Sequence, residues 1–589
     1  MPYLPNLPGS SQTRQVLEVF SGYNHNLKIG DGEFYHTQNL CADHYPMLSV
    51  RKKRGVVRLL QNPQGMLAKG ALAYVENGQL YYGEENITSY LQAKGLALSP
   101  EGEKTMVGMG AYLLIFPDKV YINTTDFSDC GAMEAYAQTS GHIEYTICEE
   151  NGNAYPAPYQ GAQQPSDPQN GDLWLDTSGS AHVLKVWSEA ASQWTQIPTV
   201  YTKISAAGIG LPFEKYDGVT ISGCAGSPQV EALNGSRLIQ EKGDDYIVVA
   251  GLLDQSYIQT EGTVTVKRSV PDMDFVTECQ NRLWGCKYGL AEGKTVNEIY
   301  CCALGDFKNW SKYQGISTDS YTASVGSDGP FTGAVTFMGN PLFFKENRLH
   351  KVYVSPGGAH QIVDTAMPGV MKGSEKSLCP VGNQLFYLSR DGVCAYTGST
   401  PTVISRKLGS VFCRDGVAGA YGSRYYISVS DGENRHLFRA DTDTGVWYRE
   451  DDLEAIAFAS LPGELYCLAS DGRLLAMNGT KGTPESSVAW SGETGLMGYG
   501  DADRKYVSRL NLRMILPVGS TARVEIQYDS DGIWHEAGTM TGRGTNSFLL
   551  PLRPRRCDHF RFRISGTGDM KLYSLARLYE SGSDVGNEV

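Results

Sequence analysis

The residues best placed to do chemistry are aspartates in two short stretches that resemble calcium-binding loops. The stretches are YDSDGIWHE (528–536) and DTDTG (441–445). A calcium loop of the EF-hand type places oxygen ligands at alternating positions and ends on a glutamate, which both stretches lack at the required position. Aspartate and glycine also form hairpin turns through side-chain hydrogen bonds to the backbone. We therefore expect turns here and predict no metal site.

Other reactive side chains lack the spacing that enzymes need. The sequence contains no HExxH, GxSxG or GxxxxGK[ST] pattern, and its ten histidines are scattered singly. Its thirteen cysteines include no CxxC pair, and the adjacent Cys301 and Cys302 lie in the strand-like NEIYCCALG, where we expect buried free thiols. The predictions are therefore no catalytic residue, no cofactor, no metal and no enzymatic activity.

Two groups of side chains are candidates for contacts with partners. The first group is the basic runs RKKR and RPRR, which could pair with phosphate or with carboxylates on a partner, although solvated strand ends are an alternative. Its cations are Arg51, Lys52, Lys53, Arg54, Arg553, Arg555 and Arg556. The second group is Trp174, Trp187 and Trp194, on short alternating strands. These tryptophans either stack on the sugar rings of a glycan or form the core of a small module.

The elements that carry these residues are β-hairpins that recur along the chain. In PLFFKENRLHKVYVS (341–355), for example, two alternating apolar and polar runs flank a Glu-Asn turn. If Leu342, Leu385, Tyr425 and Leu465 are equivalent, their spacings are 43, 40 and 40 residues. This is the period of a four-stranded propeller blade. A blade cannot bury both faces of its sheet alone, so we expect the blades to close into a ring.

Composition supports an almost all-β protein. The chain has 589 residues, 67 of them glycine and 35 tyrosine, and short helices are expected only at 85–95 and 130–138. Its formal net charge of −13 argues against a dedicated nucleic-acid binder. No apolar run approaches the roughly 18 residues that cross a bilayer, and the first residues lack a secretory core. We expect the chain to be made and kept in a cytoplasm.

The predicted fold is a β-propeller of about six or seven blades, with an inserted small β-module or β-barrel-like domain and a C-terminal β-sandwich. Residues 1–149 are expected to form an N-terminal segment and the first blades. Residues 150–270 are expected to form inserted β-modules, a Trp-rich one near 171–200 and a second near 204–270. The remaining blades are expected at 271–480, and the sandwich at 488–589.

Several stretches resemble virion proteins of tailed bacteriophages, especially propeller proteins of the tail nozzle or the head-to-tail junction. The first is LGDFKNWSKYQGISTDSYTASVGSDGPFTGAVTFMGNPLFFKENRLHKVYV (304–354), and a second, QLFYLSRDGVCAYTGS, is matched from Phe386 to Gly398. The matching positions of the first stretch are Gly305, Asp306, Asn309, Trp310, Asp328, Gly329, Thr332, Gly333, Phe344, Lys345 and Tyr353. The opening 20–55 and the module NGDLWLDTS…LKVWSEAASQW are also similar to phage structural proteins. This resemblance implies a ring, often sixfold, around a DNA conduit that passes DNA without sequence-specific binding.

The function predicted from these features is a non-enzymatic structural protein of a phage or prophage particle, in the tail or the head-to-tail junction. The resemblance implies that its partners are copies of itself and other tail, portal or adaptor proteins, without membrane insertion. It implies a location in the virion after synthesis in the bacterial cytoplasm. The alternative is a receptor-binding or adhesion protein that recognises glycans of the host surface. A propeller glycoside hydrolase, which needs paired carboxylates, is the third alternative.

Overall fold

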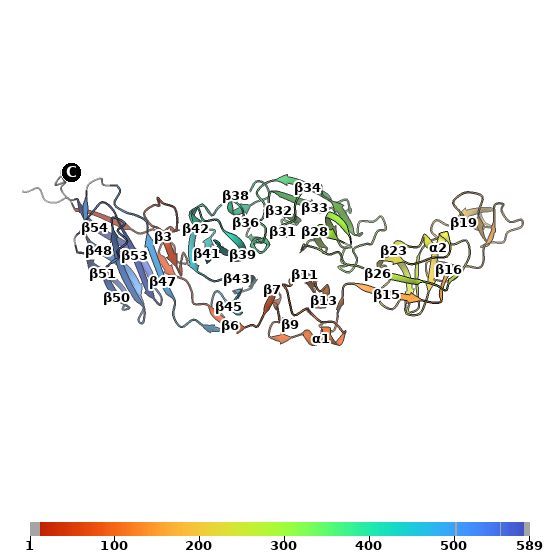
Figure 1. Cartoon of the computed structure of the whole chain (residues 1–589), viewed down its shortest axis with the longest axis horizontal. Helices are drawn as coiled ribbons and strands as arrows, with labels where there is room; N and C mark the ends of the chain where they lie inside the picture. The colour runs from red at the N-terminus through yellow and green to blue at the C-terminus, as the bar shows by residue number, and fades with distance from the viewer. Residues whose placement is uncertain (1–11, 292, 501–503, 554, 582–589) are drawn as a thin grey trace, which may run out of the picture.

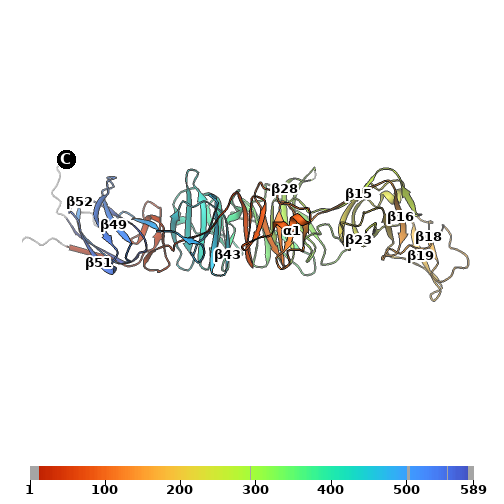
Figure 2. The ribbon, with the colours of Figure 1, turned by 90° about the horizontal axis from the view of Figure 1, so that it is seen from below.

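The computed structural model describes residues 12–291, 293–500, 504–553 and 555–581. The molecule is elongated, with a β-sandwich at one end, a ring of sheets in the middle and an inserted β-domain at the other end (Figures 1 and 2). The predicted fold class is confirmed, since the chain is almost entirely β and has a propeller, an insertion and a sandwich. No helix in the described ranges is long and apolar enough to cross a membrane.

The ring consists of seven antiparallel sheets among the described residues, each starting from an inner strand, and the first six are simple four-stranded meanders. The inner strands contact one another from β7 to β11, β27 and β31, and from β35 to β39 and β43. The 3-10 helix η1 (Glu375–Ser377) contacts both β31 and β39 and so links these two groups. Strand β43 returns to β7, which closes the ring. The first sheet contains β7 (Pro63–Lys69), β8 (Ala71–Glu76), β9 (Gln79–Tyr82) and β10 (Glu85–Asn86). The second contains β11 (Thr105–Met109), β12 (Tyr112–Phe116), β13 (Val120–Asn123) and β14 (Cys130–Ala132). The third contains β27 (Phe275–Glu278), β28 (Leu283–Ala291), β29 (Lys294–Cys301) and β30 (Tyr321–Ser324). The fourth contains β31 (Gly333–Phe337), β32 (Asn340–Lys345), β33 (Arg348–Tyr353) and β34 (Gln361–Ala366), and the fifth contains β35 (Cys379–Val381), β36 (Gln384–Ser389), β37 (Gly392–Tyr396) and β38 (Thr402–Val403). The sixth contains β39 (Arg414–Tyr421), β40 (Arg424–Ser430), β41 (Arg435–Asp441) and β42 (Val446–Asp451). The seventh contains β43 (Ala455–Leu461), β44 (Glu464–Ala469), β45 (Arg473–Ala476), β46 (Thr483–Pro484) and β6 (Gly55–Leu59).

The last sheet of the ring takes one strand from the beginning of the chain. Strand β6 pairs antiparallel with β45, and β46 pairs with the other edge of β6. Because β6 also leads directly into β7 of the first sheet, the two ends of the repeat are held together by backbone hydrogen bonds. Three short helices accompany the ring, α1 (Thr88–Ala93), η1 (Glu375–Ser377) and η2 (Arg406–Leu408).

The repeat read from the sequence has a structural meaning. Leu342, Leu385, Tyr425 and Leu465 lie in β32, β36, β40 and β44, each the second strand of its sheet, and all four are buried. The hairpins predicted around these positions are therefore present, and the repeated residue is a buried position of the second strand.

The sandwich combines both ends of the chain, which differs from the expected division. Residues 12–50 were expected to lead into the first blades, but their strands join the two sheets formed by the C-terminal strands. One sheet contains β1 (Gln12–Leu17), β4 (Leu40–Cys41), β5 (Leu48–Val50), β48 (Lys505–Leu516), β51 (Gly544–Pro551), β52 (Arg556–Cys557) and β54 (Lys571–Ser581). The other contains β2 (Gly22–Tyr23), β3 (Glu33–Gln38), β47 (Ala489–Thr494), β49 (Thr521–Tyr528), β50 (His535–Thr541) and β53 (Phe560–Thr567). The sandwich needs this N-terminal segment because its apolar residues, among them Phe20 before β2 and Phe34 on β3, complete the core.

The insertion begins earlier than expected, within the stretch predicted as a helix at 130–138. That prediction is wrong, because Ala135 and Ala137 alternate with exposed residues on β15 (Ala135–Ser140), which pairs with β26 (Thr263–Arg268). The eight-stranded sheet of the insertion also contains β16 (Ile143–Cys148), β21 (Tyr201–Ser205), β22 (Gly218–Ser222), β23 (Gly235–Gly243), β24 (Tyr246–Ala250) and β25 (Tyr257–Gln259), next to the helix α2 (Pro228–Glu231). A separate small sheet contains β17 (Tyr159–Gly161), β18 (Leu173–Asp176), β19 (Val183–Ser188) and β20 (Gln193–Gln196).

Residues that carry the phage resemblance hold the insertion against the ring. Asn309 donates to Asp217 Oδ1 over 3.0 Å and accepts from the backbone N–H of Gly218 over 2.7 Å. Arg268 forms a buried ion pair with the same aspartate. Lys345 is buried inside its blade, where its ammonium donates to the carbonyl of Ser327 over 2.7 Å. These motif positions therefore have structural roles, Asn309 at the contact with the insertion and Lys345 inside a blade.

Candidate functional site

An axial pocket of about 610 Å³ lies inside the ring, where the first halves of the inner strands meet. Its lining includes apolar side chains from different blades, Met66, Met106, Met273, Phe275 and Phe458 among them. Pockets with apolar walls and a few polar groups are the usual places for small ligands. The axial pocket is therefore one of three candidate sites.

Most of the charged groups that line the axial pocket are in ion pairs. The ammonium of Lys376 lies 2.7 Å from a carboxylate oxygen of Glu103 and donates to the carbonyl of Ile456 over 2.9 Å. These residues belong to three different blades, so Lys376 ties the ring together across the pocket. Asp274 pairs with Lys287 at 2.8 Å, whereas the carboxylate of Glu375 has no ion pair among the described residues.

The small sheet of the insertion presents an aromatic face, the second candidate. Cross-strand pairing places Tyr159 beside Trp174, Trp174 beside Lys185, and Trp187 beside Trp194. Directly paired residues share a face, and so do residues two apart on one strand. The aromatic face therefore consists of Tyr159, Trp174, Asp176, Lys185, Trp187 and Trp194. The opposite face carries Leu173, Leu175 and Leu184 and packs into the core of the insertion.

The three tryptophans of this face differ in exposure. Trp174 is buried and donates from its indole N–H to the carbonyl of Gly161 over 2.9 Å, so it has a structural role. Trp187 and Trp194 are partly exposed, with ring centroids 5.5 Å apart, and Tyr159 is 53% exposed. The core alternative therefore applies to Trp174. Of the three tryptophans, only Trp187 and Trp194 have exposed ring surface for stacking on a glycan.

The aromatic face also carries a carboxylate, that of Asp176. Asp176 pairs with Lys185 at 2.7 Å, and the Lys185 ammonium lies 4.6 Å from the ring centroid of Trp174. The hydrogen bond from Lys185 lowers the pKa of Asp176 to about 2, so this carboxylate is ionised at every physiological pH. An ionised carboxylate is a strong acceptor for hydroxyl groups.

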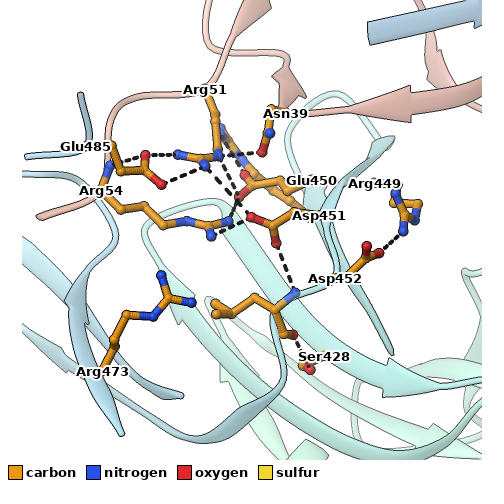
Figure 3. Close-up of polar contacts among 12 residues, drawn as sticks. Asn39, Arg51, Arg54, Ser428, Arg449, Glu450, Asp451, Asp452, Arg473 and Glu485 are labelled. Atoms are coloured by element: carbon orange, nitrogen blue, oxygen red, sulfur yellow. Dashed lines mark hydrogen bonds and ion pairs between the residues drawn. The ribbon is translucent and has the colours of Figure 1, made fainter. Parts of the chain in front are cut away.

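The basic run RKKR divides into two buried and two exposed cations. Arg51 and Arg54 were predicted to contact partners, and this is corrected by their burial in an ion network at the junction of sandwich and ring (Figure 3). Arg51 binds Glu485 with both terminal nitrogens, at 2.7 and 3.1 Å. Arg54 donates to Asp451 over 2.6 Å and to Glu450 over 2.7 Å.

The exposed members of the basic runs lie at different places. Lys52 and Lys53 border a cleft between the sandwich and the ring, the third candidate. At the other end of the sandwich, Arg553 is exposed, whereas Arg555 pairs with Asp531 at 3.1 Å. Arg556 is half-buried at the start of β52. The two basic runs therefore do not form one surface.

Neither the aspartate-rich stretches nor the cysteines form a metal centre in the described part of the chain. Asp441 and Asp531 accept hydrogen bonds from backbone groups two residues further on, as expected of turns. All thirteen cysteines are free and twelve are buried. The described residues include no group of three or more His, Cys, Asp or Glu side chains that could hold an ion.

Sequence reasoning missed the axial pocket and the face shared by Asp176 and the tryptophans. The pocket is built from residues hundreds of positions apart, for which the sequence holds no signal. The alternation in DLWLDTSGSAHVLKVW could have placed Trp174, Asp176, Lys185 and Trp187 on one side, had the register of the hairpin been known.

No family model and no curated protein matches the chain. Among solved structures, PorZ, an essential bacterial surface component of the type-IX secretion system of Porphyromonas gingivalis, matches at 12% identity, over 85% of this chain and 71% of that one, with a TM-score of 0.26. A family 43 glycoside hydrolase engineered for endo-xylanase and exo-arabinofuranosidase activity matches at 10% identity, over 53% and 98%, with a TM-score of 0.20. A family 43 arabinoxylan arabinofuranohydrolase from Bacillus subtilis matches at 10% identity, over 52% and 95%, with a TM-score of 0.14.

These matches correct one expectation from the sequence. Two of the three are glycoside hydrolases, so the lack of a recognised motif is not a reason to exclude enzymatic activity for a chain of this fold. At such low identities and TM-scores the matches carry no inference about substrate or activity. The resemblance to phage virion proteins, the ring assembly and the virion location stay predictions.

Proposed function

We propose that the chain is a recognition protein that binds carbohydrate through the aromatic face of its inserted domain. The observation that carries this proposal is that two partly exposed tryptophans, Trp187 and Trp194, lie on the same face of the small sheet as the ionised carboxylate of Asp176. Aromatic rings pack against the apolar faces of sugar rings, and a carboxylate accepts hydrogen bonds from sugar hydroxyls.

The position of the face in the molecule supports the same function. The small sheet lies at the end of the molecule opposite the sandwich (Figure 1). A ligand as large as a polysaccharide can reach this end without contacting the ring or the sandwich. The ring and sandwich then act as a rigid support that holds the recognition module away from whatever anchors the protein.

Affinity electrophoresis of the full chain against a panel of neutral and acidic polysaccharides tests the proposal. We expect at least one polysaccharide to retard the protein, and Trp187→Ala or Trp194→Ala to weaken that binding about tenfold or more, equivalent to about 1.4 kcal/mol. Thr195→Ala is the matched control, because Thr195 is next to Trp194 but belongs to the opposite face. Far-UV and near-UV circular dichroism of each variant checks that the module stays folded.

Two outcomes would count against recognition at this face. One is that no polysaccharide in the panel retards the protein. The other is that the double variant of Trp187 and Trp194 binds as well as the parent chain, which would place the binding elsewhere.

Hydrolysis at the axial pocket is a second candidate function, favoured by the three carboxylates that line it, Glu103, Asp274 and Glu375. Glycoside hydrolases use two carboxyl groups on either side of the scissile bond. The test is release of reducing ends from any polysaccharide that the aromatic face binds, with Glu375→Gln expected to abolish it. Unchanged release in Glu375→Gln would exclude this residue as a member of the pair.

A further inference from the structure

A cleft of about 630 Å³ lies between the sandwich and the ring, and positively charged side chains outnumber negatively charged ones in its lining. It is lined by His44 and Lys571 from the sandwich, by Lys52 and Lys53 from the segment that connects the two, and by Arg424 from the ring. Clefts at domain boundaries are frequent ligand sites. This cleft adjoins the ion network of Figure 3, since Arg51 also lines it.

Three ammonium groups in the cleft lack a carboxylate partner. Lys52 and Lys53 are exposed, Lys571 is half-buried, and within the described ranges none of the three has a carboxylate within 4.0 Å. Lys53 donates to the carbonyl of Ser486 over 2.8 Å, which leaves its charge uncompensated.

The acidic groups of the cleft do not neutralise this charge. Asp43 is held by Arg439 and, at 3.0 Å, by Arg424. Burial would raise the pKa of Asp43, but these guanidinium groups and the nearby Lys52 hold it below its usual value. Glu485 does not line the cleft and is bound by both terminal nitrogens of Arg51. Asp569 is exposed and is the remaining acid in the lining.

We propose that this cleft is a binding site for an oxyanion, a sulfate, phosphate or carboxylate group of a small molecule or an acidic sugar. Walls of low dielectric strengthen the field of like charges inside a cleft, and the ammonium of lysine is a compact point charge suited to such anions. The ion pairs of Arg51 and Arg54 form without these three lysines. These ion pairs therefore do not explain why positive charge is concentrated here in a chain of net charge −13. The site is separate from the aromatic face and does not depend on its function.

Thermal unfolding of the full chain at constant ionic strength tests the site. The probes are sodium phosphate, sodium sulfate and sodium glucuronate, each compared with sodium chloride of the same ionic strength. We expect at least one of the three to raise the unfolding temperature beyond chloride, and isothermal titration to give its affinity. The strongest probe identifies the class of anionic group.

The double variant Lys52→Gln/Lys571→Gln separates binding from structure. We expect it to unfold at the same or a higher temperature than the parent without anion, because repulsion between the ammonium groups is relieved, and to bind the anion about tenfold more weakly. Lys94→Gln, an exposed lysine beside α1, is the matched control and should change neither property. Equal effects of all three anions and chloride on the parent, or undiminished binding in the double variant, would overturn the proposal.

Discussion

Arg54 shows how one cation of a basic run becomes essential to the fold. The residue is 3% exposed, and its guanidinium holds two acidic side chains, Glu450 and Asp451, at the junction of sandwich and ring. Burial would raise the pKa of Asp451, but Arg54 holds it below its usual value, so Asp451 and Arg54 are both charged. The planar fork of arginine suits this double pairing, whereas the neighbouring Lys52 and Lys53 are exposed and form no ion pair among the described residues.

Substitution of Arg54 by alanine should destabilise the protein strongly. The change removes the closest cation from the buried Glu450 and the partly buried Asp451 and leaves only more distant guanidinium groups, for which we expect a loss of about 3–5 kcal/mol in the free energy of unfolding. Denaturation in urea measures the loss. Lys53→Ala, one residue earlier and exposed, should change the free energy by less than about 0.5 kcal/mol. A similar small change in Arg54→Ala would show that the network does not stabilise the junction.

His36 on β3 should make the same junction sensitive to acid. Burial, assisted by the nearby charge of Arg449, lowers the pKa of His36 to about 4. In the unfolded chain this histidine titrates near 6.5. Between pH 6.5 and 4 the unfolded state therefore binds the proton and the folded state does not, so stability contributed by neutral His36 is lost as the pH falls through this window.

Urea unfolding at a series of pH values checks this expectation. The free energy of unfolding should fall between pH 6.5 and 4, and His36→Gln should fall less steeply over the same interval. His142, on the insertion, is the matched control for substitution, because its side chain is exposed. Equal slopes in the parent and in His36→Gln would assign the acid sensitivity to other groups.

At the scale of elements, ring closure depends on close contact between β6 and the segment before β46. A Cβ atom added at Gly55 would lie 1.9 Å from the carbonyl oxygen of Lys481, so only glycine fits there. Gly55→Ala should push β6 away from its neighbour and lower the free energy of unfolding by about 1–3 kcal/mol. Gly326→Ala, at a position with open space and no left-handed backbone, is the control for the loss of a glycine. Limited proteolysis near 55–60 should become faster only in Gly55→Ala.

The hairpins themselves were accessible to sequence reasoning. Their alternation has a period of two, and their turns are built from neighbouring residues, so both signals are local. The expected helix at 130–138 failed for the opposite reason. Pairing of β15 with β26, about 130 positions away, outweighs the helical preference of a short alanine-rich stretch.

At the scale of the whole molecule, the two ends are attached differently. The core of the sandwich includes Val446 and Tyr448 from the ring, so these two parts share one apolar cluster. The core of the insertion contains no residue of the ring, and the chain enters and leaves it through the paired strands β15 and β26. The insertion should therefore be removable, whereas the sandwich should not.

Removal of residues 136–267, with a two-residue Asn-Gly turn between Ala135 and Arg268, tests this difference. Because these two residues are directly paired, a short turn can join them. The remaining chain should unfold in one transition, less stable by about 1–3 kcal/mol for the lost contacts of Asn309 with Asp217. It should also lose carbohydrate binding. Sizing chromatography and urea unfolding measure the first result, and an aggregated or unfolded product would contradict it.

The sequence alone determined the all-β class, the period of the blades and the positions of Leu342, Leu385, Tyr425 and Leu465, because alternation and turn chemistry are encoded within a few neighbouring residues. Only the tertiary structure decided that Arg51 and Arg54 are buried, that residues 12–50 complete the sandwich and that Asp176 shares a face with Trp187. Each of these outcomes depends on a partner strand or a charge far away in the chain. The residue itself is compatible with several partners, and folding selects the one that pairs its charge and buries its apolar surface.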